Sequence, residues 1–349
     1  MVPSIPSSPL LWDLFCRVVD NHGDVGVSWR LASELGRRGQ RVRLILDDRS
    51  ALTWMAPEGA RGVEVCDWPG PATPGDVVVE AFGCDLPPLF VQAMAAAPVA
   101  PVWINLEYLS AEPYVERSHT LPSPQRLGPC KWFFYPGFTQ RTGGLLREPG
   151  LVEQQQRFLR DPWLRSQGIE RLPGERVVSL LCYENAALPA LLQDLAREPT
   201  LLLLTPGHAQ SQVQSTPGGV RTHALPWLSQ NDYDRLLWSC DLNLVRGEDS
   251  LVRAIWAGSP FVWQAYPQHD GAHLAKLQAL LTQAQLPAAA AATLAAWNRA
   301  GPDAWPPLAL GTAWQEAALA WRSRLLDQID LASQLQAFVL PKLAGAGSC

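Results

Sequence analysis

The sequence lacks the features of a membrane, secreted or nucleic-acid-binding protein. No apolar run approaches the roughly 18–20 residues that cross a bilayer. The first ten residues, MVPSIPSSPL, have neither a basic segment nor a long apolar core, so no signal peptide is expected. Basic residues are too few for a nucleic-acid binder, since 28 Lys and Arg stand against 33 Asp and Glu, a net charge of −5. We therefore expect a cytoplasmic protein that binds neither membrane nor nucleic acid.

The cysteines also lack the pattern of a disulfide framework or a zinc site. The chain has seven of them, they form no CxxC pair, and most lie in or beside apolar runs such as LFCRVV. Cysteine in such runs behaves as a small buried hydrophobic residue, so all seven are expected to be free thiols. His22, His269 and His273 do not have the spacing of metal ligands, and no metal site is predicted.

Short apolar runs alternate with helical patterns along both halves of the chain, which is typical of a parallel sheet covered on both faces by helices. The expected strands are Trp12–Val19, Arg41–Leu46, Val63–Trp68, Asp76–Phe82, Val102–Leu106 and Lys131–Tyr135, and then Arg176–Tyr183, Leu201–Thr205, Asp241–Val245 and Phe261–Tyr266. A length of 349 residues favours two domains. The sequence thus predicts an α/β protein with two Rossmann-like, doubly wound domains facing across a cleft. Their predicted ranges are residues 1–165 and 170–325, and a helical tail, residues 326–349, is expected to pack back on the first domain.

The first candidate loop follows the first predicted strand and reads DNHGDVG. Gly23 and Gly26 permit tight turns and the close approach of a ligand, although the loop matches neither GxGxxG nor the Walker A pattern. Asp20, at the carboxyl end of the strand, could act as a general base or orient a cationic acceptor. Asp20 could instead be a turn residue, and Asp24 could cap the helix that follows.

The second candidate loop, RGEDS, lies at the equivalent place in the second half, between Asp241–Val245 and a predicted helix, Ser250–Ala257. Asp249 or Ser250 could cap that helix, and its first backbone N–H groups could hold a diphosphate. Arg246 could add a bidentate contact to the same phosphates. A solvated turn is the alternative, but a sugar-nucleotide site better explains all five residues together.

Seven segments resemble the protein-arginine rhamnosyltransferase family, EarP. They are DNHGDVGVSWRLA, WINLEYLSAEPY, KWFFYPGFTQRTGGLL, LLCYEN, LSQNDYDRLLW, DLNLVRGEDS and FVWQAYPQHDGAHLAKL, in the family's order. The resemblance implies a GT-B fold. It also implies transfer of rhamnose from dTDP-β-L-rhamnose to an arginine in the N-terminal domain of translation elongation factor P, with inversion at the anomeric carbon. Neither a metal nor another cofactor is implied.

The resemblance also implies roles for individual residues. Asp20 matches the catalytic carboxylate and Glu248 a second carboxylate that is important for turnover. The donor-binding positions it implies are Asn21, His22, Gly23, Asp24, Tyr183, Trp227, Gln230, Tyr233, Arg246, Gly247, Asp249 and Ser250. Trp227 and Tyr233 fall near positions where the family uses aromatic residues around the thymine. Leu181 stands where an aromatic residue is expected, so Trp227 would supply more of the stacking.

Two other functions remain open at this point. One is a GT-B sugar-nucleotide enzyme with a small-molecule acceptor, and the other is a non-catalytic protein that binds elongation factor P or a nucleotide. The presence of both Asp20 and Glu248 favours an enzyme. Lys276, on the predicted helix His273–Ala284, is interpreted as a solvated charge rather than a phosphate ligand.

Overall fold

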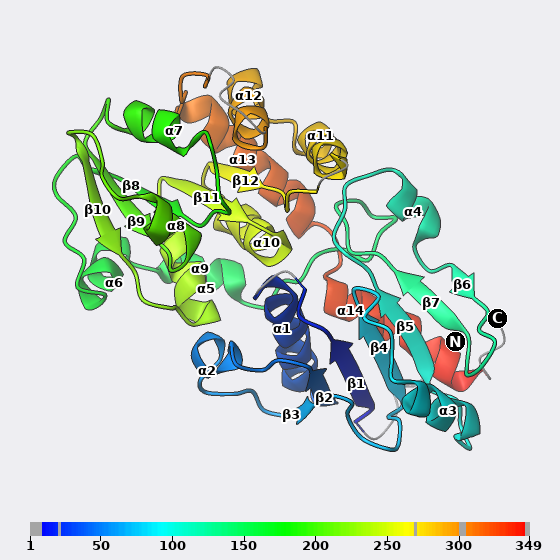
Figure 1. Ribbon diagram of the computed structural model, residues 1–349. Coiled ribbons are helices and arrows are strands. Elements are labelled where there is room, and N and C mark those ends of the chain that lie inside the picture. The colour runs from blue at the N-terminus through cyan, green and yellow to red at the C-terminus, as the bar shows by residue number, and fades with distance from the viewer. Residues whose placement is uncertain (1–8, 20–21, 269–270, 300–304, 346–349) are drawn as a thin grey trace. The chain divides into compact units, whose positions relative to one another are not determined.

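The computed structural model describes residues 9–19, 22–268, 271–299 and 305–345, and it divides the chain into two units (Figure 1). The first unit comprises Met1–Glu148 with Gln328–Cys349, and the second is Pro149–Asp327. The predicted boundary near residue 165 is thus displaced. Residues 149–165 belong to the second unit because Trp163 and Leu164 pack into its core with Val177.

The described part of the first unit contains a seven-stranded sheet with the order β3-β2-β1-β4-β5-β7-β6. The strands are β1 (Leu11–Cys16), β2 (Arg41–Leu46), β3 (Val63–Asp67), β4 (Val77–Ala81), β5 (Val102–Leu106), β6 (Pro122–Ser123) and β7 (Lys131–Phe134). All neighbours are parallel except β6 and β7. The central strands β1, β4 and β5 are buried along their length, as their apolar sequences predict.

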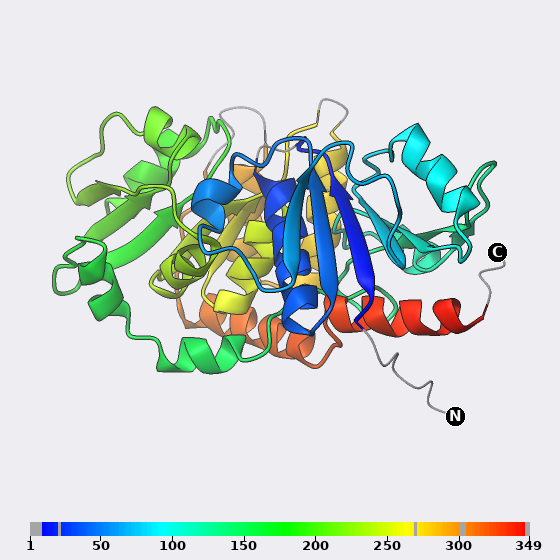
Figure 2. The same ribbon diagram turned by 90° about the horizontal axis from the view of Figure 1, so that it is seen from below.

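Helices cover both faces of this sheet. Helices α1 (Gly23–Arg37) and α14 (Leu331–Ala344) lie on one face, where Leu31, Leu35 and Leu335 join Leu14 in a single core (Figures 1 and 2). Helix α3 (Pro88–Ala96) packs on the opposite face through Phe90 and Met94. The short helices α2 (Leu52–Met55) and α4 (Tyr114–Ser118) lie in connections.

The second unit has a five-stranded parallel sheet in its described residues, in the order β10-β9-β8-β11-β12. Its strands are β8 (Arg176–Leu180), β9 (Thr200–Leu204), β10 (Val220–Ala224), β11 (Leu242–Arg246) and β12 (Phe261–Gln264). The edge strand β10 is not predicted from the sequence, because VRTHA exposes three of its five residues and has no apolar run.

The helices of the second unit differ from the prediction in the long helical stretches. They are α5 (Leu151–Arg157), α6 (Arg160–Ser166), α7 (Leu188–Leu195), α8 (His208–Gln212), α9 (Gln230–Trp238), α10 (Glu248–Ala257), α11 (Ala272–Ala284), α12 (Ala288–Trp297) and α13 (Thr312–Leu326). The predicted helical tail, residues 326–349, contains α14, and a connection in which Asp330 caps α14 separates this helix from α13. None of the helices in the described ranges is long and apolar enough to cross a membrane.

Among the described cysteines, Cys130 departs from the prediction. Cys16, Cys66, Cys84, Cys182 and Cys240 are free thiols, and four of these five are buried. Cys130 is disulfide-bonded, so the expectation that all seven cysteines are free is wrong for this residue.

Both sheets share one connectivity that fixes where ligands can bind. The first strand along the chain, β1 or β8, lies beside the fourth, β4 or β11. The connections that leave these neighbouring strands run in opposite directions, and α/β sheets bind ligands beyond the carboxyl ends of such strands. In the second unit the loops at this point begin at Leu181 and at Gly247.

Candidate functional site

The RGEDS segment forms the end of β11 and the beginning of α10. The helix begins at Glu248, two residues earlier than predicted, and its N-cap is Gly247 rather than Asp249 or Ser250. Gly247 has φ +68° and ψ −168°, a backbone conformation that favours glycine. Gly247, as the N-cap, has no side chain that could cap this helix. Its first backbone N–H groups, at residues 248–250, therefore stand at a helix N-terminus suited to an anion.

Arg246 is held beside this helix by groups from the loop that follows the neighbouring strand, β8. Its Cζ lies 4.4 Å from the centre of the Tyr183 ring, and its Nη1 donates a hydrogen bond of 3.3 Å to the carbonyl of Cys182. Tyr266 packs edge-on against Tyr183 at 5.4 Å between ring centres. No carboxylate in the described ranges forms an ion pair with Arg246, so the charge of its guanidinium is available to a ligand.

Gln264, at the end of β12, joins the two loops of this site. Its Oε1 accepts a hydrogen bond of 2.9 Å from the Tyr183 backbone N–H, and its carbonyl accepts one of 3.3 Å from Gly247. Trp263 Nε1 donates to the Gly247 carbonyl at 2.7 Å. These bonds fix the backbone on both sides of Arg246. Gln264 and Tyr266 were not predicted as site residues, although they belong to the predicted strand Phe261–Tyr266 and to one of the family motifs.

The remaining donor-binding candidates of the second unit lie around the start of α9. Ser229 caps this helix by accepting a hydrogen bond of 3.1 Å from the Asp232 N–H, and Gln230 is its first residue. Trp227, between β10 and α9, has 49% of its surface exposed, as suits a ring that stacks on a base. Tyr233 packs against the core that contains Trp163 and Leu236, so part of its role is structural.

Glu248 and Lys276 form an ion pair between α10 and α11. Lys276 Nζ lies 2.6 Å from Glu248 Oε1, and their side chains are only 26% and 18% exposed. The interpretation of Lys276 as a solvated charge is therefore wrong.

In the first unit, Asp20 and Asn21 lie outside the described residues, so the roles expected for them stay predictions. His22 is the N-cap of α1, and Gly23 and Asp24 form its first turn. Capping of this helix by Asp24 was one of two alternatives; the N-cap is His22, and Asp24 Oδ2 accepts a hydrogen bond of 2.8 Å from the Val19 N–H. The buried Asp24 thus joins the start of α1 to the residue that follows β1 by three positions.

A carboxylate that the sequence analysis missed lies at the carboxyl end of β5. Glu107 Oε1 accepts a hydrogen bond of 2.7 Å from Asn105 Nδ2, and burial raises the pKa of the Glu107 carboxyl. Beside it in sequence, Tyr108 stacks on Phe82 with ring centres 4.6 Å apart. Glu107 has no ion-pair partner among the described side chains. The sequence signal that could have identified Glu107 is a single acidic residue directly after a buried strand.

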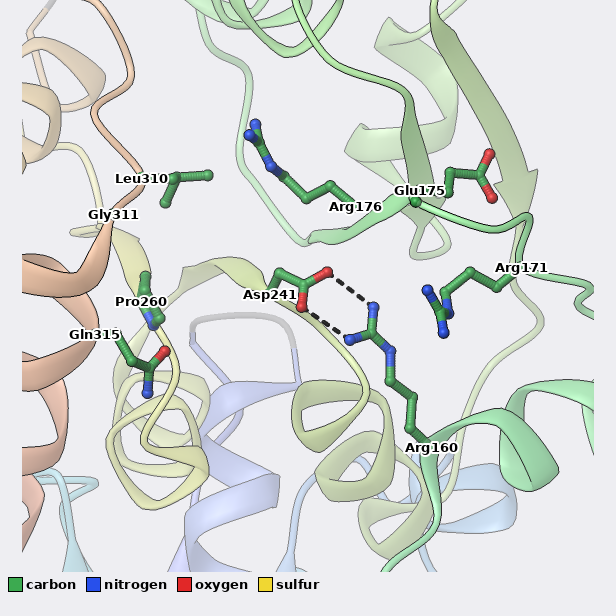
Figure 3. A pocket seen from close by; sticks show the side chains of 10 residues that line it. Arg160, Arg171, Glu175, Arg176, Asp241, Pro260, Leu310, Gly311 and Gln315 are labelled. Carbon is green, nitrogen blue, oxygen red and sulfur yellow. Dashed lines mark hydrogen bonds and ion pairs between the residues drawn. The ribbon is translucent and has the colours of Figure 1, made fainter.

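Figure 3 shows a separate pocket of about 470 Å³ at the opposite, amino end of the second sheet. Arg160 donates two hydrogen bonds of 2.8 Å to Asp241 there. Burial alone would raise the pKa of Asp241, but the bonds from Arg160 hold it below its usual range. Arg171 and Arg176 are likewise paired, with Asp161 and Glu198. Because each of these arginines is neutralised, this pocket is less suited to a diphosphate than the site at Arg246.

The comparison with protein families decides the identity. Residues 12–340 match the family of the elongation factor P rhamnosyltransferase EarP. The chain belongs to this family. A protein-arginine rhamnosyltransferase from Pseudomonas aeruginosa is 44% identical over 368 residues, covering 94% of this chain and 98% of the relative. One from Neisseria meningitidis serogroup B is 34% identical over 79% of each chain. As a member of EarP, the chain is an enzyme, a protein-arginine rhamnosyltransferase.

Solved structures confirm the fold class. A structure that describes EarP-mediated arginine glycosylation of translation elongation factor EF-P matches with a TM-score of 0.64 and 33% identity, over 94% of this chain and 98% of that one. The calicheamicin glycosyltransferase CalG4 matches with a TM-score of 0.53 and 15% identity, over 97% of this chain and 100% of that one, and shares the fold alone. The predicted α/β, GT-B class with two Rossmann-like domains is therefore confirmed. Among the described residues no group of three or more His, Cys, Asp or Glu is placed to hold a metal ion.

Proposed function

We propose that this EarP member transfers rhamnose from dTDP-β-L-rhamnose to one arginine in the N-terminal domain of elongation factor P, with inversion at the anomeric carbon. Support for the acceptor comes from the related EarP structure, which concerns arginine glycosylation of EF-P. Support for the donor comes from the second unit. The observation that carries it is the guanidinium of Arg246, which has no carboxylate partner in the described part of the chain and lies over Tyr183 beside the N-terminus of α10.

The second unit supplies groups that suit a nucleoside diphosphate as leaving group. As the bond to the sugar breaks, negative charge develops on the diphosphate. Arg246, the Ser250 hydroxyl and the first N–H groups of α10 would stabilise this charge, and they are already in place before the reaction. Trp227 and Tyr266, each about half exposed, offer aromatic surface for the thymine.

The acceptor needs negatively charged groups, because a guanidinium has a pKa above about 12 and is a poor nucleophile while it is charged. In this proposal Asp20 binds the guanidinium, aligns one nitrogen and takes up its proton. Glu107 adds a second carboxylate at the carboxyl edge of the same sheet, beside the stacked rings of Phe82 and Tyr108. A cation and the face of an aromatic ring attract each other, so these rings would favour the same acceptor.

A single displacement follows from this division of roles. The arginine nitrogen attacks the anomeric carbon from one face while dTDP leaves from the other, so the configuration inverts. The oxocarbenium-like transition state resembles that of glycoside hydrolysis, but dTDP needs no protonating acid. No metal or other cofactor takes part in the proposal, since cationic side chains and amides carry the charge of the leaving group.

Intact-mass spectrometry of elongation factor P tests the proposal. After incubation with the enzyme and dTDP-β-L-rhamnose, EF-P should gain the mass of one deoxyhexose, and an EF-P variant with lysine at the acceptor arginine should gain none. EDTA should leave the rate unchanged. If EF-P stays unmodified while the donor is consumed, a small-molecule acceptor is favoured. If EF-P stays unmodified and the donor stays intact, a non-catalytic binding protein is favoured. Loss of activity in EDTA with recovery on addition of a divalent metal would contradict the metal-free reaction.

A further inference from the structure

Glu248 occupies an unusual place for a carboxylate. It is the first residue of α10, two positions after Arg246, at the helix end where the proposed function places the diphosphate. An unpaired carboxylate there would repel the diphosphate, and it would also compete for the favourable potential of the helix N-terminus. Glu248 is nevertheless compatible with a diphosphate site if a nearby positive charge neutralises its carboxylate.

Lys276 supplies that compensation. It comes from a different helix, α11, and its Nζ reaches Glu248 Oε1 at 2.6 Å. Both side chains are mostly buried, so solvent screens their interaction much less than it would screen an exposed pair. The bond also restricts the Glu248 carboxylate to the side of α10 that faces α11.

We propose that Lys276 is a positioning residue of the donor site, which neutralises Glu248 and fixes its carboxylate so that the diphosphate can bind beside it. The inference rests on the proposed function, because it assumes that the ligand at this helix end is a diphosphate. It differs from a role as phosphate ligand, in which Lys276 would contact the donor directly. It also differs from a purely structural role, in which the pair would only join α10 to α11.

Calorimetric titration of dTDP into four full-length proteins tests this inference: the wild type, Lys276→Met, Glu248→Gln and the double variant. Lys276→Met removes the cation that is paired with Glu248 and leaves the carboxylate charged, so dTDP affinity should fall roughly tenfold, the effect of one like charge in a partly buried site. The double variant should recover an affinity close to that of the wild type, because the repelling carboxylate is gone. Lys276→Arg keeps the charge and should bind dTDP almost normally.

Thymidine provides the control, since it lacks the diphosphate and should bind all four proteins equally if they are folded. Unchanged dTDP affinity in Lys276→Met would overturn the inference. A double variant as weak as Lys276→Met would also overturn it, because Lys276 would then act on the phosphates directly. Failure of the wild type to bind dTDP would instead remove the donor proposal, and the inference with it.

Discussion

The two sheets of this protein have equivalent orders over five strands but carry different charged side chains where the strands end. In the second unit Arg246 has no carboxylate partner among the described residues, and the acidic Glu248 is paired with Lys276. In the first unit the corresponding edge carries Glu107, which has no cationic partner in the described ranges. One backbone topology can therefore present either an anion site or a cation site, depending on a few side chains at the strand ends.

Each unit also has aromatic rings near this charged residue. Arg246 lies over Tyr183, which packs against Tyr266, and Glu107 directly precedes Tyr108, which stacks on Phe82. Transfer of a sugar from a nucleoside diphosphate to a guanidinium needs both kinds of site, since the donor is anionic and the acceptor is cationic. The contrast between the units thus agrees with the proposed division into a donor side and an acceptor side.

The largest expected effect is on the rate of rhamnose transfer and comes from a change on the acceptor side alone. Asp20→Asn keeps the size of the side chain and removes its charge, so transfer to EF-P should slow by about 10²–10⁴, the usual cost of losing a positioned base. Single-turnover assays of rhamnose transfer measure this rate. Near-normal transfer by the variant would leave Asp20 as a turn residue.

The next largest effect is on dTDP affinity and comes from a change on the donor side alone. Arg246→Ala should weaken dTDP binding by about 1.5–3 kcal/mol, the range for a hydrogen bond to a charged group. Calorimetry on the full-length variant measures the change, and the paired Arg171→Ala serves as the matched control at the amino end of the same sheet. Equal losses in both variants would show that Arg246 has no special place in the donor site.

Glu107→Gln tests whether Glu107 belongs to the cation site of the first unit. If Glu107 helps to bind the acceptor, the KM for EF-P should rise by roughly three- to tenfold with the dTDP affinity unchanged, as for one moderately exposed charge-assisted contact. Because burial raises the pKa of Glu107, its ionisation opposes folding above the ordinary carboxyl pKa. The variant should therefore be at least as stable as the wild type at pH 7 by chemical denaturation. Glu153→Gln, an exposed position on α5, is the control. An unchanged KM for EF-P would separate Glu107 from the acceptor site.

The smallest effect concerns a histidine near the same edge. His119 packs against Phe134, and its Nδ1 accepts a hydrogen bond of 3.1 Å from the Tyr135 N–H. Burial lowers the pKa of His119 from 6.5 to about 4, so at neutral pH this side chain adds no positive charge to the first unit. Between these values the unfolded chain binds a proton that the folded chain does not, so stability should fall as the pH falls from 6.5 to 4.

The expected loss of stability across this range is about 1–2 kcal/mol, since the ring is only partly buried. Urea denaturation at several pH values measures it, with His119→Gln as the variant that cannot titrate. The same pH dependence in both proteins would show that His119 is not the responsible group.

Sequence reasoning predicted most of the fold, and the physical reason is the burial of the sheets. Arg41–Leu46 and Val102–Leu106 agree with β2 and β5 to the residue, because parallel strands that are covered on both faces appear as uninterrupted apolar runs. The edge strand β10 has no such run and was missed. The domain boundary was displaced because the apolar face of α6, with Trp163 and Leu164, is short and amphipathic.

The candidate site was less predictable than the fold. The motif placed Arg246 and Glu248 at a strand-to-helix connection, and the structure has them there. Sequence could not show that Arg246 stacks on Tyr183, that Gln264 joins the two loops, or that Lys276 reaches Glu248, because these contacts join separate strands and helices. The roles carried over from the family, including those of Asn21 and Asp20 outside the described residues, remain predictions.

Titration of dTDP into the Asp20→Asn variant is the most decisive measurement of whether acceptor chemistry and dTDP binding belong to different units. We expect this variant to bind dTDP with the affinity of the wild type while it no longer transfers rhamnose at a normal rate. A loss of dTDP affinity as large as that of Arg246→Ala would place Asp20 in the donor site and contradict the division between the two sheets.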